Sequence, residues 1–202
     1  MSTELCMLAK QYGVDKCPEI NHNYTPTYHS VLNSTRSKIL IFLEIGIGNI
    51  PLMAPIVGKS YKPGASLRMW RDYFPNASVI GCDIDKTVLF NDEHRIKTFF
   101  ADQSSKVSLQ NLIETDIKPP NNMVDIILDD GSHIKEHQIL SFKTLWKYVK
   151  SGGFYIIEDV WKTHLDEFAS LPGIFGFSDG EVIAKFNDKS DMQGLIIYKK
   201  TN

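Results

Sequence analysis

Short apolar runs rich in β-branched residues recur along the chain, each bounded by turn-forming residues. Such runs are typical of buried strands. They predict strands at Ile39–Ile45, Ala77–Cys82, Ile96–Phe100, Val124–Leu128 and Phe154–Ile157. Between them, apolar positions spaced at a helical period predict helices at Ser66–Tyr73, Lys106–Glu114 and Ile134–Val149. This alternation predicts an α/β fold with a parallel, doubly wound sheet.

The pattern changes near the C-terminus, where two strand-like runs, Glu181–Phe186 and Gly194–Lys200, are separated by a short polar link. They predict an antiparallel hairpin, which in class I methyltransferases follows the fifth parallel strand. We therefore expect a Rossmann-like, seven-stranded sheet of that class. Residues 1–37 are expected to form an N-terminal cap and residues 38–202 the Rossmann-like core of a single domain.

Composition and charge indicate which kind of partner the chain is suited to bind. The 202 residues fit one domain, and 43% hydrophobic with 23% charged residues is ordinary for a globular protein. A net charge of −2 gives no basic field for nucleic acid, so a small molecule is the better candidate.

The N-terminus lacks a secretion leader, and no apolar run could span a membrane. Three scattered cysteines form no disulfide framework or zinc cluster. We expect a cytoplasmic protein.

The first predicted strand runs into Glu44-Ile45-Gly46-Ile47-Gly48. Glycines at the carboxyl end of such a strand let the backbone turn sharply and approach a ligand closely. A dinucleotide-binding fingerprint would need a third glycine where Pro51 stands. We therefore expect a different cofactor, and a loop that does not pass directly into a helix.

Polar residues also follow the second and third predicted strands. Asp83 is placed to accept hydrogen bonds from a ribose diol, whereas Asp85 is expected to form a turn or cap a helix. Asp102 is placed to accept from an adenine amino group, with Gln103 adding a second polar contact. The alternative for Asp102 is the N-cap of the next helix.

Acidic pairs end the fourth and fifth predicted strands, as Asp129-Asp130 and Glu158-Asp159. Neighbouring carboxylates repel unless something positive lies between them, and carboxylate oxygens suit Mg²⁺. We predict Asp130, Glu158 and Asp159 as ligands of a divalent metal ion. Asp129 could turn toward the cofactor's methionine amine or serve as a structural acceptor.

His133 follows Asp130 closely, at the expected start of the next helix. A neutral imidazole beside a metal can take the proton of a hydroxyl during methyl transfer, which makes His133 a candidate base. Its alternative role is capping. His137 would complete an H-x-x-x-H pair, but no further Cys or His accompanies it, so we interpret it as structural.

Four segments together resemble the macrocin/mycinamicin family of sugar O-methyltransferases. They are Leu43–Gly48, Pro63–Pro75, Asp129–His133 and Ile157–Val160, and Gly13-Val14-Asp15-Lys16, His22, Tyr24 and Tyr28 extend the resemblance. The resemblance implies transfer of a methyl group from S-adenosylmethionine to a deoxysugar hydroxyl. It also implies metal ligands at Asp130, Glu158 and Asp159 and a base at His133. The residues expected to bind the cofactor are Glu44, Gly46, Gly48, Ser66, Asp83, Asp102, Gln103 and Asp129.

The part of the chain that carries the proposed catalytic residues is also similar to the cephalosporin hydroxylase-like group. The fold by itself therefore does not determine the reaction. The chain is shorter than the macrolide enzymes, and a neighbouring subunit of a homo-oligomer could complete the acceptor pocket. The segment Asn49–Pro63 is either a lid or an ordinary surface loop.

Three other functions compete with sugar O-methylation. A nicotinamide-dependent oxidoreductase is disfavoured by Pro51 and by the predicted hairpin, and a non-catalytic subunit by the intact set of acids and His133. A catechol-type O-methyltransferase would use the same cofactor and metal with a different acceptor.

Overall fold

The computed structural model describes residues 2–177, 180–186 and 191–201. Its strands are β1 Ile41–Ile45, β2 Ser78–Asp83, β3 Ile96–Phe100, β4 Val124–Asp129, β5 Val149–Val160, β6 Gly180–Phe186 and β7 Gly194–Lys200. Its α-helices are α1 Glu4–Tyr12, α2 Thr25–Leu32, α3 Ile50–Val57, α4 Ala65–Tyr73, α5 Lys106–Asn111, α6 Lys135–Leu145, α7 Leu165–Ala169 and α8 Leu171–Ile174.

The strands form one seven-stranded sheet in the order β3-β2-β1-β4-β5-β7-β6. Strands β1 to β5 pair in parallel, whereas β7 runs antiparallel to both β5 and β6. This confirms the predicted α/β class and the C-terminal hairpin, whose connecting residues 187–190 lie outside the described residues. The carboxyl ends of β1 to β5 meet at one edge of the sheet, where ligands bind in open α/β folds.

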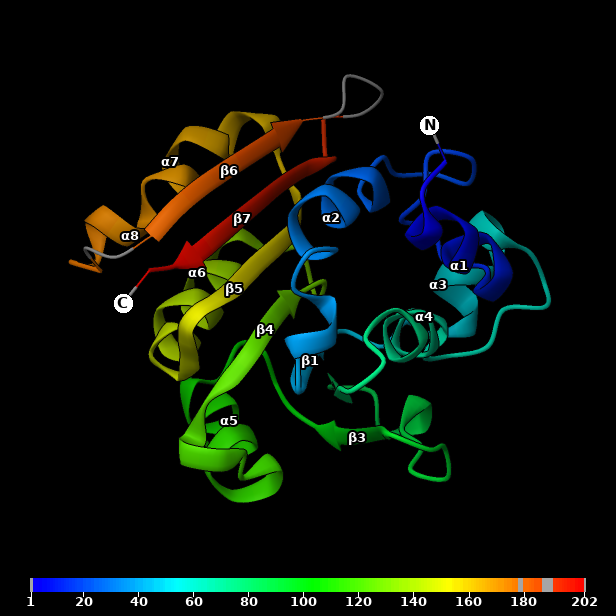
Figure 1. Cartoon of the computed structure of the whole chain (residues 1–202), viewed down its shortest axis with the longest axis horizontal. Coiled ribbons are helices and arrows are strands. Elements are labelled where there is room, and N and C mark those ends of the chain that lie inside the picture. Colours follow the sequence, from blue (N-terminus) through cyan, green and yellow to red (C-terminus); the bar gives the residue numbers. More distant parts are fainter. Residues whose placement is uncertain (1, 178–179, 187–190, 202) are drawn as a thin grey trace.

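Helices cover both faces of the sheet (Figure 1). Helices α1, α2 and α4 pack over one face, and α5 to α8 over the other. Along β1 the side chains alternate between the two layers, with Phe42 in the first and Leu43 in the second. Alternation of this kind follows from the pleat of a strand buried on both faces.

Two expectations were wrong at the level of elements. The loop after Gly48 does pass into a helix, because Asn49 caps α3 by accepting from the Leu52 N–H at 3.0 Å, and Pro51 is tolerated in a first turn. The predicted helix Ile134–Val149 is α-helical only over Lys135–Leu145; Trp146–Tyr148 continue it as a short 3-10 helix, and Val149 already begins β5.

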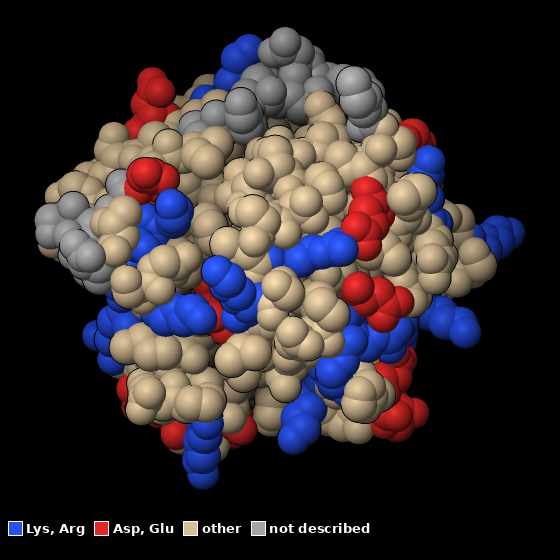
Figure 2. Space-filling model, in the orientation of Figure 1, with Lys and Arg blue, Asp and Glu red and all other residues tan. Residues whose placement is uncertain are grey.

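Charge is mixed over the surface shown in Figure 2, where acidic and basic residues are interspersed. The net charge of the chain is −2. No helix in the described part of the chain is both apolar and long enough to cross a bilayer.

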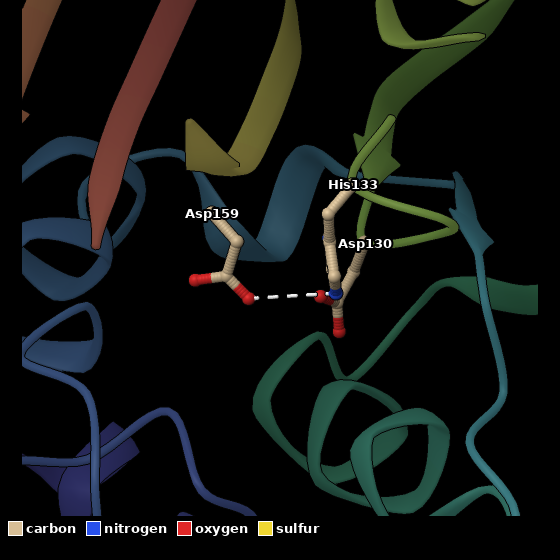
Figure 3. A group of neighbouring side chains, drawn as sticks. All are labelled: Asp130, His133 and Asp159. Atoms are coloured by element: carbon tan, nitrogen blue, oxygen red, sulfur yellow. Dashed lines mark ion pairs between the residues drawn. The ribbon is translucent and has the colours of Figure 1, made fainter. Parts of the chain in front are cut away.

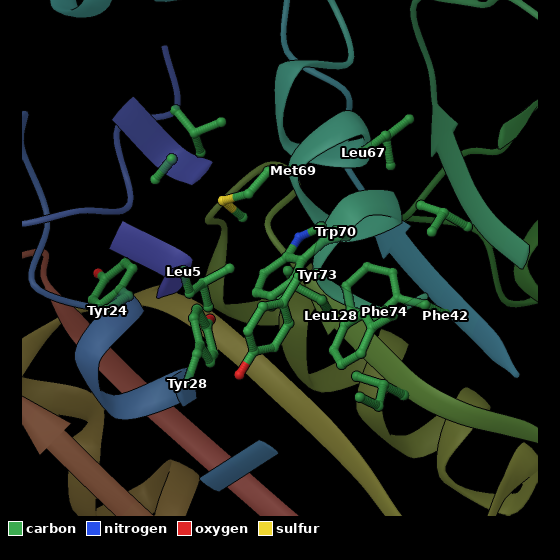
Figure 4. Packing of buried hydrophobic residues seen from close by; sticks show 14 of the residues in the cluster. Leu5, Tyr24, Tyr28, Phe42, Leu67, Met69, Trp70, Tyr73, Phe74 and Leu128 are labelled. Atoms are coloured by element: carbon green, nitrogen blue, oxygen red, sulfur yellow. The ribbon is translucent and has the colours of Figure 1, made fainter. Parts of the chain in front are cut away.

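An aromatic cluster joins the cap to the sheet (Figure 4). Trp70 of α4 is 1% exposed. Its ring centroid lies 5.4 Å from that of Tyr28, 5.0 Å from that of Phe42 and 5.6 Å from that of Phe74. Because the cluster includes residues from α2, α4 and β1, it fixes the cap over the first strand.

Replacing Trp70 with Ala should therefore lower the free energy of unfolding by about 3–5 kcal/mol, the usual cost of deleting a buried aromatic side chain. Urea denaturation would measure the loss. The matched control is Trp161→Ala, because Trp161 is 42% exposed, and that change should cost about 0.5 kcal/mol or less. Equal losses in the two variants would contradict the assignment of Trp70 to the core.

Candidate active site

A cavity of about 400 Å³ opens at the carboxyl edge of the sheet. This is within the usual range for small-molecule sites. It is bordered by the loops that follow β1, β2, β3 and β4, by helix α3, by Asp159 near the end of β5 and by residues of the N-terminal cap. Six of the eight predicted cofactor residues and two of the three predicted metal ligands border this one cavity; Glu44, Asp129 and Glu158 do not.

The glycine loop after β1 is clamped by both neighbouring strands. The Gly46 N–H donates to Cys82 O at 2.8 Å, and the Ile47 N–H donates to Asp83 Oδ2 at 2.9 Å. From the other side, the Asp130 N–H donates to Ile45 O at 2.9 Å. Gly46 has φ +98°, and a Cβ there would lie 2.0 Å from Asp130 O. Only glycine fits this position, so the sequence motif is explained by close backbone approach.

Two of the predicted cofactor carboxylates, Asp83 and Asp102, border the cavity. Asp83 also accepts from the Asp85 N–H at 2.9 Å, and Asp85 caps the next short helix, as predicted. Asp102 accepts from the backbone N–H and the hydroxyl of Ser104, which lowers its pKa. The capping alternative for Asp102 is wrong, because the N-cap of α5 is Ser105.

Gln103 and Asp129 hold the loop after β4. The Gln103 amide donates to Asp129 Oδ1 at 2.6 Å and accepts from the Ser132 N–H at 2.9 Å. Asp129 is fully buried, and burial raises its pKa to about 7. Its side chain does not border the cavity, which favours the structural-acceptor alternative; a direct cofactor contact of Asp129 stays a prediction.

Glu44 lies beneath the glycine loop and not in the cavity. It accepts from the Ser66 hydroxyl at 2.8 Å, and Ser66 itself borders the cavity. Burial raises the pKa of Glu44 to about 7, against the opposing effect of the Lys16 ammonium. Glu44 can therefore support the loop and Ser66, whereas direct contact with a cofactor stays a prediction.

The side chains of Asp130, His133 and Asp159 converge (Figure 3), and all three residues border the cavity. One potential ligand atom from each lies within 4.8 Å of the others, and His133 Nε2 is 3.6 Å from Asp159 Oδ2. This donor set fits a divalent cation. His133 and Asp159 have φ of +56° and +54°. Such left-handed conformations of non-glycine residues are costly and cluster at functional sites.

Glu158, the third predicted ligand, lies beside this group but is 1% exposed and does not border the cavity. Its Oε1 accepts from the Tyr28 hydroxyl and its Oε2 from Lys16 Nζ, both at 2.6 Å. Burial and the charge of Asp130 raise its pKa. Each carboxylate oxygen has a second lone pair, so these bonds leave Glu158 able to bind a metal.

Residues of the cap complete the site, although no role was expected for any of them. Lys16 Nζ lies 2.5 Å from Asp130 Oδ2, and the Tyr24 hydroxyl donates to Asp159 Oδ1 at 2.5 Å. His22 stacks on Tyr24, and its Nδ1 is 3.7 Å from Asp159 Oδ1. The only signal for these residues was the resemblance, because they lie more than a hundred positions from their partners, as in the separation of 114 between Lys16 and Asp130.

Part of the positive charge expected between the acidic pairs comes from the chain itself. Lys16 is buried among Glu44, Asp130 and Glu158. Burial and neighbouring acids still raise the pKa of Asp159 as well as that of Glu158. The single ammonium group of Lys16 is outnumbered by the carboxylates around it, so a divalent cation would complement the remaining negative charge.

His137 borders the cavity, and its Nδ1 shares a hydrogen bond of 2.9 Å with the Ser132 hydroxyl. This contact is consistent with the structural role inferred for it.

Sequence comparison finds relatives among enzymes of known activity. The chain is 37% identical over 165 residues to the 8-demethyl-8-α-L-rhamnosyl tetracenomycin-C 2′-O-methyltransferase of Streptomyces olivaceus, a match that covers 81% of this chain. It is 36% identical over 179 residues to the demethylmacrocin O-methyltransferase of Streptomyces fradiae and over 177 residues to the mycinamicin VI 2″-O-methyltransferase of Micromonospora griseorubida. The chain belongs to the macrocin/mycinamicin family of sugar O-methyltransferases. The resemblance seen in the sequence is thereby confirmed.

Solved structures agree with membership of this family. The MycE methyltransferase from the mycinamycin biosynthetic pathway, solved in complex with Mg and SAH, superposes with a TM-score of 0.72 at 27% identity. The match covers 100% of this chain and 56% of that one. The predicted class I methyltransferase fold is thus confirmed. No model in the scan of protein families matches the chain.

This member of the sugar O-methyltransferase family spans only part of its relatives' length. The matched region is 39% of the S. olivaceus enzyme and 38% of the S. fradiae enzyme. The site described above lies within the matched part of the fold.

The glycine loop gives a direct test of the cavity's cofactor side. Gly46→Ala should weaken binding of S-adenosylhomocysteine by about tenfold or more, because the new Cβ would collide with Asp130 O and displace the loop. Isothermal titration calorimetry would measure the affinity.

Gly58→Ala is the matched control for backbone strain. Gly58 has φ +101°, similar to Gly46, but a Cβ there would meet nothing within 4 Å. Both variants should lose about 1–3 kcal/mol of stability from the left-handed conformation. Only Gly46→Ala should bind S-adenosylhomocysteine more weakly. Unchanged affinity in that variant would show that the glycine loop does not contact the ligand.

Proposed function

We propose that this chain catalyses the transfer of a methyl group from S-adenosylmethionine to a hydroxyl group of a glycosylated small molecule, assisted by a divalent metal ion. One observation carries the proposal. The glycine loop and Asp83 border the same cavity as Asp130, Asp159 and His133. A methyl donor and a metal-held hydroxyl would thereby lie side by side. Family membership supports the same reaction.

On the cofactor side, Asp83 would bind the ribose hydroxyls and Asp102 the adenine amino group. Gly46, Gly48 and Ser66 would line the methionine part, close to the acidic group. The ligand named with the MycE structure, SAH, is the demethylated form of this cofactor. A carboxylate that accepts from a ribose diol makes charge-assisted hydrogen bonds, which are short and strong.

On the metal side, Asp130, Glu158 and Asp159 would hold the ion. A bound divalent cation lowers the pKa of a coordinated hydroxyl and fixes its position. The residues present suit the ion, because hard carboxylate oxygens are the ligands that Mg²⁺ prefers and the cluster carries more negative than positive charge.

His133 would act as the base. Its Nε2 faces the acidic group, where it would accept the proton as the hydroxyl oxygen attacks the methyl carbon. The new O–CH₃ bond would form as the S–CH₃ bond breaks, leaving S-adenosylhomocysteine and a protonated His133. Asp159 would stabilise that imidazolium charge.

The acceptor is proposed from the relatives, whose names specify hydroxyls of rhamnosyl tetracenomycin and of mycinamicin VI. We infer a deoxysugar hydroxyl. Apolar side chains of α3, Leu52 and Met53, border the cavity and would contact the apolar part of such an acceptor. Because the relatives are much longer, we propose that further protein, such as a second copy in a homo-oligomer, completes the acceptor pocket.

We also propose that cap and core act as one unit, since Lys16 and Tyr28 of the cap reach the acids of the core. In this view, residues 1–37 are part of the catalytic fold and not a separable domain.

The choice of cofactor separates this proposal from a nicotinamide-dependent oxidoreductase. Calorimetric titration should give measurable binding of S-adenosylmethionine and S-adenosylhomocysteine and none of NAD. Asp83→Ala should weaken that binding by about 1–3 kcal/mol, through loss of charge-assisted hydrogen bonds. Tighter binding of NAD than of S-adenosylhomocysteine would overturn the proposal.

The metal mechanism predicts different losses at different residues. With a rhamnosylated polyketide as acceptor, methyl transfer should stop in chelator and return with Mg²⁺ or Mn²⁺, and Asp130→Ala or Asp159→Ala should abolish it. Cofactor binding should persist in these variants, because the proposed ion holds the acceptor. His133→Gln should retain the metal yet slow transfer by roughly 10²- to 10⁴-fold. Full activity in chelator would refute the metal's role.

A further inference from the structure

We propose that Lys16 is a positioning residue of the acidic site, whose ammonium group ties Asp130 to Glu158 and so sets the spacing of the carboxylates that bind the divalent ion. This inference rests on the function proposed above. It assigns a task to a buried cation that contributes neither a metal ligand nor a base.

The contacts of Lys16 support a positioning role. Its Nζ lies 2.5 Å from Asp130 Oδ2 and 2.6 Å from Glu158 Oε2, and the residue is 1% exposed. Asp130 follows β4 and Glu158 lies in β5, so a single ammonium group bridges two neighbouring strand ends. A third carboxylate, that of Glu44 in β1, is 3.7 Å away. All three carboxylates around the Lys16 ammonium group thus belong to strands of the sheet or to a residue that directly follows one.

The backbone holds Lys16 in place independently of these charges. Gly13 ends α1 in the left-handed conformation, which turns the chain toward the sheet. The Lys16 carbonyl then accepts from the N–H groups of Tyr24 and Thr25, at 3.1 and 3.0 Å. The same anchoring carries Tyr24 and Tyr28, whose hydroxyls donate to Asp159 and Glu158. The cap thus presents three donors to the acids as one preformed unit.

Positioning and simple charge compensation predict opposite effects on metal affinity. If Lys16 only neutralised negative charge or occupied the ion's place, its removal would tighten metal binding by removing a repulsive cation. If Lys16 orients the ligands, its removal weakens metal binding. Loss of partners that orient metal ligands typically costs 10- to 100-fold in affinity.

The test is the affinity of the full chain for Mn²⁺ alone, measured by electron paramagnetic resonance or calorimetry. Lys16→Met should weaken binding by about 10- to 100-fold. Lys10→Met is the matched control, because Lys10 is an exposed cap lysine that pairs with Glu19 and not with the acids of the site, among the described residues, and this variant should bind Mn²⁺ as the wild type does. Affinity for S-adenosylhomocysteine reports whether each variant retains its fold.

Tyr28→Phe provides a second variant in case Lys16→Met fails to fold. It removes one donor to Glu158 without changing any charge, so it too should weaken Mn²⁺ binding severalfold. Unchanged or tighter binding in a folded Lys16→Met would overturn the positioning role of Lys16 while leaving the metal mechanism intact. If Lys16→Met does not fold, unchanged binding in Tyr28→Phe would contradict the idea that donors from the cap orient Glu158. Failure of the wild type to bind Mn²⁺ would instead refute the metal mechanism and this inference together.

Discussion

The carboxyl edge of the sheet depends on one buried ammonium group that pairs with acids from three strands. Burying several carboxylates together is costly, and a single fixed cation offsets only part of that cost. The ammonium group of Lys16 pairs with Glu44, Asp130 and Glu158, which lie at or next to the carboxyl ends of β1, β4 and β5. This pairing adds a polar contact between the cap and the sheet, beside the aromatic packing around Trp70. It also leaves the cluster short of positive charge, which is the property that a metal site needs.

The glycine loop after β1 and the acidic loop that begins at Asp130 after β4 are joined by direct backbone contacts. The Asp130 N–H binds Ile45 O, and Asp130 O lies against Gly46, so neither loop can shift without moving the other. Gln103, which follows β3, also holds the acidic loop through its hydrogen bonds with Asp129 and the Ser132 N–H. This mechanical coupling would keep a sulfonium methyl group and an acceptor hydroxyl in register, which is the main requirement of a transfer reaction.

Much of this molecule could be predicted from local sequence. Buried parallel strands are continuous apolar runs, and residues at their ends, such as Asp83 and Asp130, follow directly from the topology. Lys16 and Tyr28 could not be placed in this way, because only tertiary packing brings them to acids that lie 142 and 130 positions away. Helix α3 was missed because the segment after Gly48 was interpreted as a loop once Pro51 had ruled out a dinucleotide-binding fingerprint, although a first turn accepts proline.

These long separations also bear on how the molecule forms. Contacts between residues far apart in sequence carry a loop-closure entropy that local contacts avoid. Lys16 and Tyr28 precede β5 in the chain, so during synthesis their hydrogen bonds to Glu158 can form only after β5 has been made. Leu5 faces no such delay, because α1 packs against α2 and α4. An acidic site ordered by the cap is therefore open only to a chain whose fifth strand has already been synthesised.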